Sequence, residues 1–165
     1  MEKIALCPGT YDPITEGHVD VIKRCIKIFD EVIIAVSKNP RKRPLYSILK
    51  RTEFIERIFK KCNNIRVVSF DGLLIKLAEK EKINVIIKGL RAISDFEYEF
   101  QMAQINKKLN PDIETMFLVT NPKYAYLSSS AVKEVASFGG CITGLVPKEI
   151  ENDIIQSFNK KKQRC

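Results

Sequence analysis

The sequence predicts an α/β fold: one doubly wound, Rossmann-like domain with a five-stranded parallel sheet, helices on both faces and a helical C-terminus. Two observations carry this prediction. Short apolar runs alternate with amphipathic helical segments, and such strands become parallel through right-handed crossovers. The chain also has 165 residues, of which 45% are hydrophobic and 29% charged, as expected for a single globular domain covering 1–165.

A change in apolar spacing marks the first strand and the first helix. The run of apolar residues at 4–7 indicates a buried strand over 3–7, whereas apolar positions 19, 22, 26 and 29 recur at helical spacing within 17–29. The later strands are predicted over 31–37, 65–70, 83–88 and 114–120. The later helices are predicted over 47–62, 72–82, 95–110, 129–138 and 147–161, the last with Pro147 in its first turn.

The helix predicted over 95–110 is apolar on two sides. One stripe consists of Phe96, Phe100 and Ala103, and nearly opposite lie Tyr98, Met102, Ile105 and Leu109. We expect one stripe to meet the sheet. The other is either a subunit interface or a face covered by other parts of the same chain.

Composition limits the classes of function. The net charge of +8 suits nucleic acid or small polyphosphates equally, and no nucleic-acid motif accompanies it, so no nucleic-acid partner is expected. No apolar run is long enough to span a bilayer, and the N-terminus does not have the pattern of a signal peptide. We therefore expect a cytoplasmic protein without a membrane partner.

The five cysteines do not indicate a metal centre. They lie at 7, 25, 62, 141 and 165, without a Cys-x-x-Cys pair, and the chain has a single histidine. We expect free thiols. No carboxylate cluster forms an obvious metal cage either, so no metal-ligating side chain is assigned, and Asp12 is only a weak candidate near a metal.

The loop at 8–18, Pro-Gly-Thr-Tyr-Asp-Pro-Ile-Thr-Glu-Gly-His, is the most informative segment. It joins the first strand to the first helix, and open α/β sheets bind phosphate at this position because helix-terminal N–H groups and the helix dipole point toward the anion. It also places His18 in the first turn of that helix. The sequence therefore predicts a nucleotide site.

Three motifs in this order resemble a known family. Thr15-x-Gly17-His18 is similar to the Thr/His-x-Gly-His motif of nucleotidyltransferases. The string at 8–15, the segment Ile-Lys-Gly-Leu-Arg-Ala-Ile-Ser-Asp-Phe-Glu-Tyr-Glu at 87–99, and Leu-Ser-Ser-Ser at 127–130 resemble bacterial phosphopantetheine adenylyltransferases. The likeness covers nearly the whole chain. It implies transfer of the adenylyl group of ATP, with Mg²⁺, to 4′-phosphopantetheine, in a homohexamer that coenzyme A inhibits.

This reaction needs positioned cations and N–H donors rather than a covalent nucleophile, because two polyanions meet while charge grows on the phosphate oxygens. The resemblance assigns transition-state stabilisation to His18, which can donate a hydrogen bond or a positive charge. Lys42, after the second strand, and Arg91, after the fourth, are the other two catalytic candidates.

The resemblance also implies the binding residues. Thr10 contacts both substrates, while Leu74 and Lys88 join Lys42 in binding the acceptor. Lys88 stands where family members usually have arginine, which keeps the charge but loses bidentate geometry and puts the acceptor affinity in doubt. The ATP-binding candidates, besides Thr10, His18 and Arg91, are Tyr11, Gly89, Leu90, Glu99, Tyr124, Ala125, Tyr126, Leu127, Ser128, Ser129 and Ser130.

Purely structural roles are alternatives to several of these assignments. The serines at 128–130 would cap any helix, Glu99 would suit an exposed helix face, and Leu74 would suit the core. For the whole protein, one alternative is a related nucleotidyltransferase that uses nicotinamide mononucleotide or glycerol phosphate as acceptor. A second alternative is a non-catalytic nucleotide-binding or nucleic-acid-binding module, which the charge alone suggests.

Overall fold

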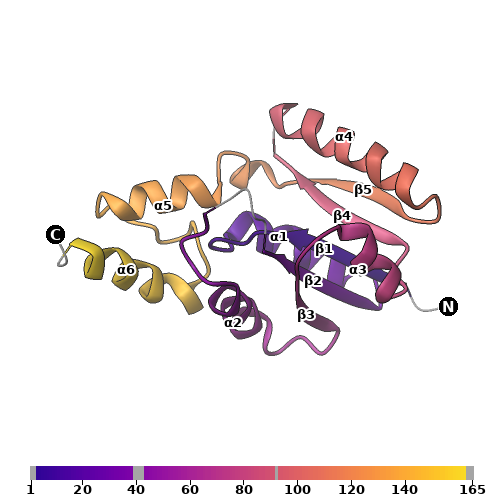
Figure 1. Cartoon of the computed structure of the whole chain (residues 1–165). Coiled ribbons are helices and arrows are strands. Elements are labelled where there is room, and N and C mark those ends of the chain that lie inside the picture. The colour runs from indigo at the N-terminus through magenta and orange to yellow at the C-terminus, as the bar shows by residue number, and fades with distance from the viewer. Residues whose placement is uncertain (1–2, 39–42, 92, 163–165) are drawn as a thin grey trace.

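The computed structural model describes residues 3–38, 43–91 and 93–162. Its sheet has five parallel strands in the order β3-β2-β1-β4-β5, with helices on both faces (Figure 1). The strands are β1 (Ile4–Gly9), β2 (Glu31–Ser37), β3 (Ile65–Phe70), β4 (Val85–Leu90) and β5 (Glu114–Val119). The helices are α1 (Glu16–Ile26), α2 (Ile48–Phe59), α3 (Leu74–Lys80), α4 (Ile93–Leu109), α5 (Ser129–Ser137) and α6 (Lys148–Lys162). The predicted fold class is confirmed.

Two hydrophobic clusters cover the two faces of the sheet. The larger cluster joins alternate residues of the central strands, such as Cys7 and Ile34, to α1, α2, α5 and α6. The smaller cluster joins the other face, including Leu6 and Ile33, to α3. Because successive strand residues point to opposite faces, the central strands are apolar throughout, as expected for a parallel sheet covered on both sides.

Strands β1 and β4 end later than the sequence predicts. Pro8 and Gly9 still belong to β1, which stays paired with β2 up to Gly9 and Val36. Gly89 and Leu90 likewise belong to β4 rather than to the loop after it. Proline and glycine are depleted in strands, and their presence moved both predicted ends too early. A short 3₁₀ helix, η1 (Pro122–Tyr124), was not predicted.

The helix α4 and the strand β5 lie at one end of the molecule, with α6 at the other (Figure 1). Phe96 of α4 packs against Phe117 of β5, with 6.1 Å between their ring centroids. Both predicted stripes of α4 nevertheless keep exposed apolar side chains, at Phe96, Tyr98, Phe100, Ile105 and Leu109. The described part of the chain therefore leaves this helix only partly covered.

Candidate active site

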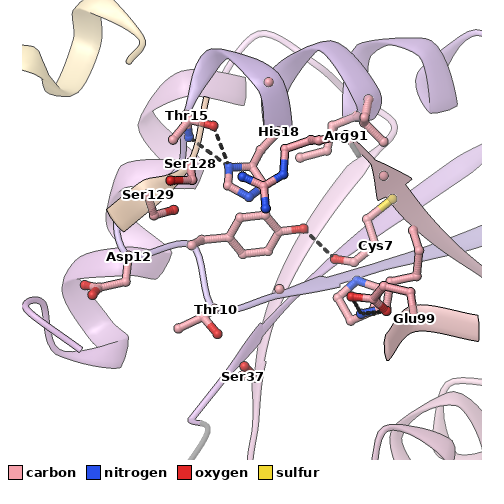
Figure 2. Close-up of a pocket in the computed structure, with 18 of the residues that line it drawn as sticks. Cys7, Thr10, Asp12, Thr15, His18, Ser37, Arg91, Glu99, Ser128 and Ser129 are labelled. Carbon is pink, nitrogen blue, oxygen red and sulfur yellow. Dashed lines mark hydrogen bonds and ion pairs between the residues drawn. The ribbon is translucent and has the colours of Figure 1, made fainter. Parts of the chain in front are cut away.

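A cavity of about 930 Å³ opens at the carboxyl edge of the sheet, where the strand order reverses (Figure 2). Strands β1 and β4 pair at Ala5–Val85 and Leu6–Ile86 and then separate. The split between them is the crevice in which open α/β sheets bind ligands. Its lining includes three segments far apart in the sequence, namely the end of β1 with its loop, the end of β4 and the start of α5, together with residues from β2, β3, α3 and α4.

His18 lies in the first turn of α1 and faces this cavity. Its Nδ1 atom is 3.0 Å from the backbone nitrogen of Thr15 and 2.8 Å from the Thr15 hydroxyl (Figure 2). A backbone N–H can only donate, so Nδ1 accepts this hydrogen bond and the neutral ring carries its proton on Nε2. Burial, together with the nearby positive charge of Arg91, lowers the pKa of His18 to about 4. At neutral pH the ring is therefore an uncharged donor.

The side chain of Tyr11 packs against the ring of His18. Its buried ring meets His18 edge-on, with 5.2 Å between centroids, and its hydroxyl donates to the carbonyl oxygen of Cys7 at 2.9 Å. Burial raises the pKa of Tyr11 well above its usual value. Gly9 is required by this ring, because a Cβ at Gly9 would lie 2.7 Å from Cζ of Tyr11. The sequence motifs identified Tyr11 only as an ATP-binding candidate and did not predict this role of its side chain.

The second wall comes from β4 and α4. Lys88 is half-buried, and its Nζ lies 3.1 Å from Oε2 of Glu99. Arg91 donates through Nη1 to the carbonyl oxygen of Leu127 at 2.8 Å, which links the end of β4 to the segment before α5. Two of the predicted residues, Lys88 and Glu99, thus form an ion pair with each other inside the cavity.

The third wall is the start of α5. The Ser128 side chain accepts a hydrogen bond from the backbone N–H of Ala131 and caps the helix, the purely structural role considered for these serines. The hydroxyl of Ser129 donates to the carbonyl oxygen of Pro13 at 2.8 Å. These hydroxyls therefore also hold the fold together, and the helix start remains directed at the cavity with the N–H groups that suit an anion.

Asp12 is an anchor for the neighbouring loop. Its buried carboxylate accepts hydrogen bonds from the backbone N–H groups of Leu45 and Tyr46, both at 2.9 Å, and Nζ of Lys133 lies 2.7 Å away. The weak suggestion that Asp12 lies near a metal receives no support from these contacts. Asp12 and Lys133 both line the cavity.

The structure brings most predicted site residues together. Those that line the cavity are Thr10, Tyr11, His18, Leu74, Lys88, Gly89, Arg91, Glu99, Leu127, Ser128, Ser129 and Ser130. Four predicted ATP-binding residues do not line it: Leu90, Tyr124, Ala125 and Tyr126. Tyr124 instead borders a separate cavity of about 240 Å³ beside α1. Lys42 lies outside the described residues.

The charges around the described cavity favour a polyanion. Four basic side chains, Arg43, Lys88, Arg91 and Lys133, line it together with two carboxylates, Asp12 and Glu99. Each carboxylate pairs with a lysine. Within the described ranges, no group of three or more histidine, cysteine or acidic side chains could hold a metal ion. In the same ranges, no helix is both long enough and apolar enough to cross a bilayer.

Comparison with known proteins adds sequence relatives over nearly the full length. A family model described as cytidylyltransferase-like matches residues 6–135. The phosphopantetheine adenylyltransferase of Clostridium tetani is 57% identical over 96% of this chain and 99% of its own length. The enzyme of the same name from Caldanaerobacter subterraneus is 53% identical, with the same coverage.

Solved structures with lower sequence identity share the fold. A protein from Vibrio parahaemolyticus, assigned as a nicotinate-nucleotide adenylyltransferase, superimposes with a TM-score of 0.71 over 94% of this chain and 99% of that one, at 16% identity. A lipopolysaccharide core biosynthesis protein from Thermoplasma volcanium has a TM-score of 0.52 over 73% of this chain and 98% of its own, at 19% identity. These two likenesses concern the fold alone.

Proposed function

Because this chain belongs to the phosphopantetheine adenylyltransferase family, within the cytidylyltransferase-like group, we propose that it transfers the adenylyl group of ATP to 4′-phosphopantetheine. The products are dephospho-coenzyme A and pyrophosphate, so the reaction is a step in making coenzyme A. The observation that carries this proposal is that His18, from α1, and Arg91, after β4, lie near each other at one cavity in the split between β1 and β4.

The proposed mechanism is a direct in-line displacement. An oxygen of the acceptor phosphate attacks the α-phosphorus of ATP, and the bond to the bridging oxygen of the leaving pyrophosphate breaks. Nε2–H of His18 donates to a phosphate oxygen as negative charge grows in the transition state. The neutral ring suits this role, since a hydrogen bond from a fixed donor needs no proton transfer during the reaction.

Basic side chains hold the two substrates against each other. In this proposal Arg91 and the N–H groups at the start of α5 bind the phosphates of ATP, and Lys88 binds the acceptor phosphate. Thr10, directly after β1, contacts both substrates, Leu74 lies beside the pantetheine arm, and Lys42 bridges the phosphates. Mutual positioning of two polyanions supplies much of the rate enhancement in this kind of reaction.

The same proposal treats Mg²⁺ as part of the ATP substrate. The cavity's two described carboxylates are both paired with lysines, so the described residues offer no cage for the ion. Mg²⁺ keeps most of its shell as phosphate oxygens and water. Its charge offsets that of the triphosphate, while the steps above depend on the protein's own donors.

Assembly, regulation and location complete the proposal. The exposed apolar side chains of α4 support a subunit interface on this helix, and we propose that it is buried in a homohexamer, as the family resemblance implies. Coenzyme A combines the adenylyl and pantetheine parts of the product, so we propose that it binds in the same cavity and inhibits the enzyme. The described cysteines are free thiols, which fits the cytoplasm as the site of reaction. The proposed reaction uses small substrates and includes no nucleic-acid or membrane partner.

The test is pyrophosphate release from ATP and Mg²⁺ with and without 4′-phosphopantetheine. Release that depends on phosphopantetheine, and is absent with CTP, is the expected result. Nicotinamide mononucleotide and glycerol phosphate serve as alternative acceptors, because Lys88 leaves the acceptor pocket without the arginine that family members usually have. Release with either of these compounds, but not with phosphopantetheine, would overturn the proposed acceptor and retain the reaction type.

A further inference from the structure

We propose that Arg51 is a positioning residue, which fixes the backbone of Thr10 and both ends of the segment that carries Lys42. This inference rests on the proposed adenylyl transfer and adds a residue that acts on the reaction from outside the cavity. Arg51 does not line the cavity. It lies on α2 and is only 1% exposed, which is unusual for an arginine on an amphipathic helix.

The guanidinium of Arg51 holds three carbonyl oxygens from three different segments. Nη1 donates to the carbonyl of Thr10 at 2.5 Å and to that of Ser37 at 2.8 Å, and Nε donates to the carbonyl of Tyr46 at 3.1 Å. Thr10 follows β1, Ser37 ends β2, and Tyr46 precedes α2. One planar group with five donors can meet this arrangement, whereas an ammonium ion cannot match its geometry.

The contact with Thr10 sets the direction of the backbone N–H of Tyr11, a candidate hydrogen-bond donor to a phosphate of ATP. The carbonyl of Thr10 and the N–H of Tyr11 belong to the same peptide unit, which is planar, and in a trans peptide the two groups point in opposite directions. When Arg51 draws the carbonyl to one side, the N–H of Tyr11 is held on the other. Tyr11 itself has a left-handed backbone, with φ of 50°. Arg51 therefore helps to hold a conformation that non-glycine residues adopt only when contacts require it.

The other two contacts hold the ends of the segment that bears Lys42. At its start, the carbonyl of Ser37 meets Arg51, while the N–H of the same peptide unit, from Lys38, donates to Phe70 at 3.0 Å. At its end, the carbonyl of Tyr46 meets Arg51, and the N–H groups of Leu45 and Tyr46 meet Asp12. Both ends are thus tied to the β1 loop that leads to His18.

The energetics argue for a specific role of this arginine. Burial of a guanidinium is costly, and it lowers the pKa of Arg51. Hydrogen bonds from a charged donor to three carbonyls offset this cost and leave those carbonyls satisfied. A small displacement of groups that position substrates can reduce the rate about 100-fold. Arg51 should therefore affect turnover more than it affects the binding of ATP.

The experiment compares Arg51→Met with Arg57→Met as a matched control on the same helix. Arg57 pairs with Glu53 and Asp153, away from the cavity, so its loss should leave kcat unchanged. For Arg51→Met we expect kcat to fall about 100-fold with a small change in the Kd of ATP. Equal losses of kcat in the two variants, or an unchanged kcat in Arg51→Met, would overturn the proposal.

A double-mutant cycle separates positioning from a general structural effect. If Arg51 acts largely through the segment that carries Lys42, Arg51→Met should cost less than about tenfold in kcat when Lys42 is already alanine. The same fold loss in both backgrounds would overturn that route. If Arg51→Met does not fold, Arg51→Lys takes its place. The kcat of Arg51→Lys is expected to lie between that of the wild-type protein and the value expected for Arg51→Met. A lysine variant with full kcat would contradict the inference.

Hydrogen exchange tests the positioning role of Arg51 independently of activity. The amides of Leu45 and Tyr46 should exchange faster in Arg51→Met, or in Arg51→Lys, while those of β3 keep the rates of the unchanged protein. Unaltered exchange at Leu45 and Tyr46 would overturn the positioning role of Arg51. If the unchanged protein released no pyrophosphate with phosphopantetheine, the proposed function would fail, but this readout would still decide the role of Arg51.

Discussion

The Nδ1 atom of His18 accepts a hydrogen bond from the backbone N–H of Thr15, 3.0 Å away, so the residue that caps α1 also sets the tautomer of the imidazole. Protonation of the ring would add a hydrogen to Nδ1, and this hydrogen would face the N–H of Thr15. Local geometry, burial and the charge of Arg91 therefore all oppose the imidazolium form. The same contact between Thr15 and His18 therefore begins the helix and helps to set the protonation state of the site.

The first prediction concerns the pH at which His18 gains a proton. It is the only histidine in the chain, so one imidazole signal should titrate with a midpoint near 4 and show the Nε2–H tautomer at neutral pH. Because the pKa is lowered in the folded protein, the unfolded chain binds this proton at a higher pH than the folded protein does. The His18 contribution to stability is thus fully present above about pH 6.5 and is lost as the pH falls toward 4. A midpoint near 6.5 by NMR would contradict the structure.

The second prediction is kinetic. Substitution of His18 by alanine should reduce kcat by several hundred-fold, because removal of one transition-state donor typically costs about 3–4 kcal/mol. The Kd of ATP, measured by calorimetry, should change much less. An equal loss in both quantities would mean that His18 acts in ground-state binding.

The third prediction addresses Lys88. Replacement by arginine should lower the KM for phosphopantetheine about fivefold, equivalent to about 1 kcal/mol, because a guanidinium can bind a phosphate through two parallel hydrogen bonds. The kcat and the KM for ATP serve as internal controls and should stay constant. A higher KM for phosphopantetheine in this variant would show that the ion pair with Glu99 depends on lysine geometry.

The fourth prediction contrasts two glycines of the 8–18 segment, Gly9 at the end of β1 and Gly17 in the first turn of α1. Alanine at Gly9 would collide with the ring of Tyr11, at 2.7 Å, and should lower the free energy of unfolding by about 1–3 kcal/mol. Alanine at Gly17 would make an ordinary contact of 3.5 Å with Cβ of Tyr124, so stability should be kept. Urea denaturation distinguishes the two, and equal stability of both variants would show that Tyr11 can move aside.

The fifth prediction tests the proposed hexamer. Glutamate at Leu109, which is 52% exposed on α4, should place a charge in the interface and reduce the sedimenting mass at a fixed concentration. Glutamate at Leu49, which is 80% exposed on α2, is the control and should leave the mass unchanged. If both variants sediment as the unchanged protein does, α4 is not the interface.

Much of the architecture follows from sequence patterns. The five strands, the six helices and the position of His18 in the first turn of α1 all depend on local spacing of apolar residues, and the structure confirms them. The ends of β1 and β4 were wrong by about two residues because Pro8, Gly9 and Gly89 are poor strand formers that tertiary pairing overrides.

The contacts that organise the site were harder to predict. Arg51 lies in an amphipathic helix, where an arginine is typical of a solvent-facing position, and its partners are carbonyls that no residue pattern reveals. The roles of Asp12 and of the Tyr11 ring likewise depend on segments brought together only by the fold. Sequence motifs identified which residues gather at the cavity, and tertiary structure decides how they are held.

The short pairing between β1 and β4 has a consequence for the protein during its synthesis. Ala5 leaves the ribosome long before its partner Val85, and Ser129 emerges later still. A nascent chain that ends before β4 carries the complete 8–18 segment and enough sequence for β1 to β3, but it lacks the parts of the cavity formed by β4, α4 and the start of α5. Incomplete translation products are therefore expected to be unable to hold both substrates, and catalytic competence begins only when α5 reaches the edge of the sheet.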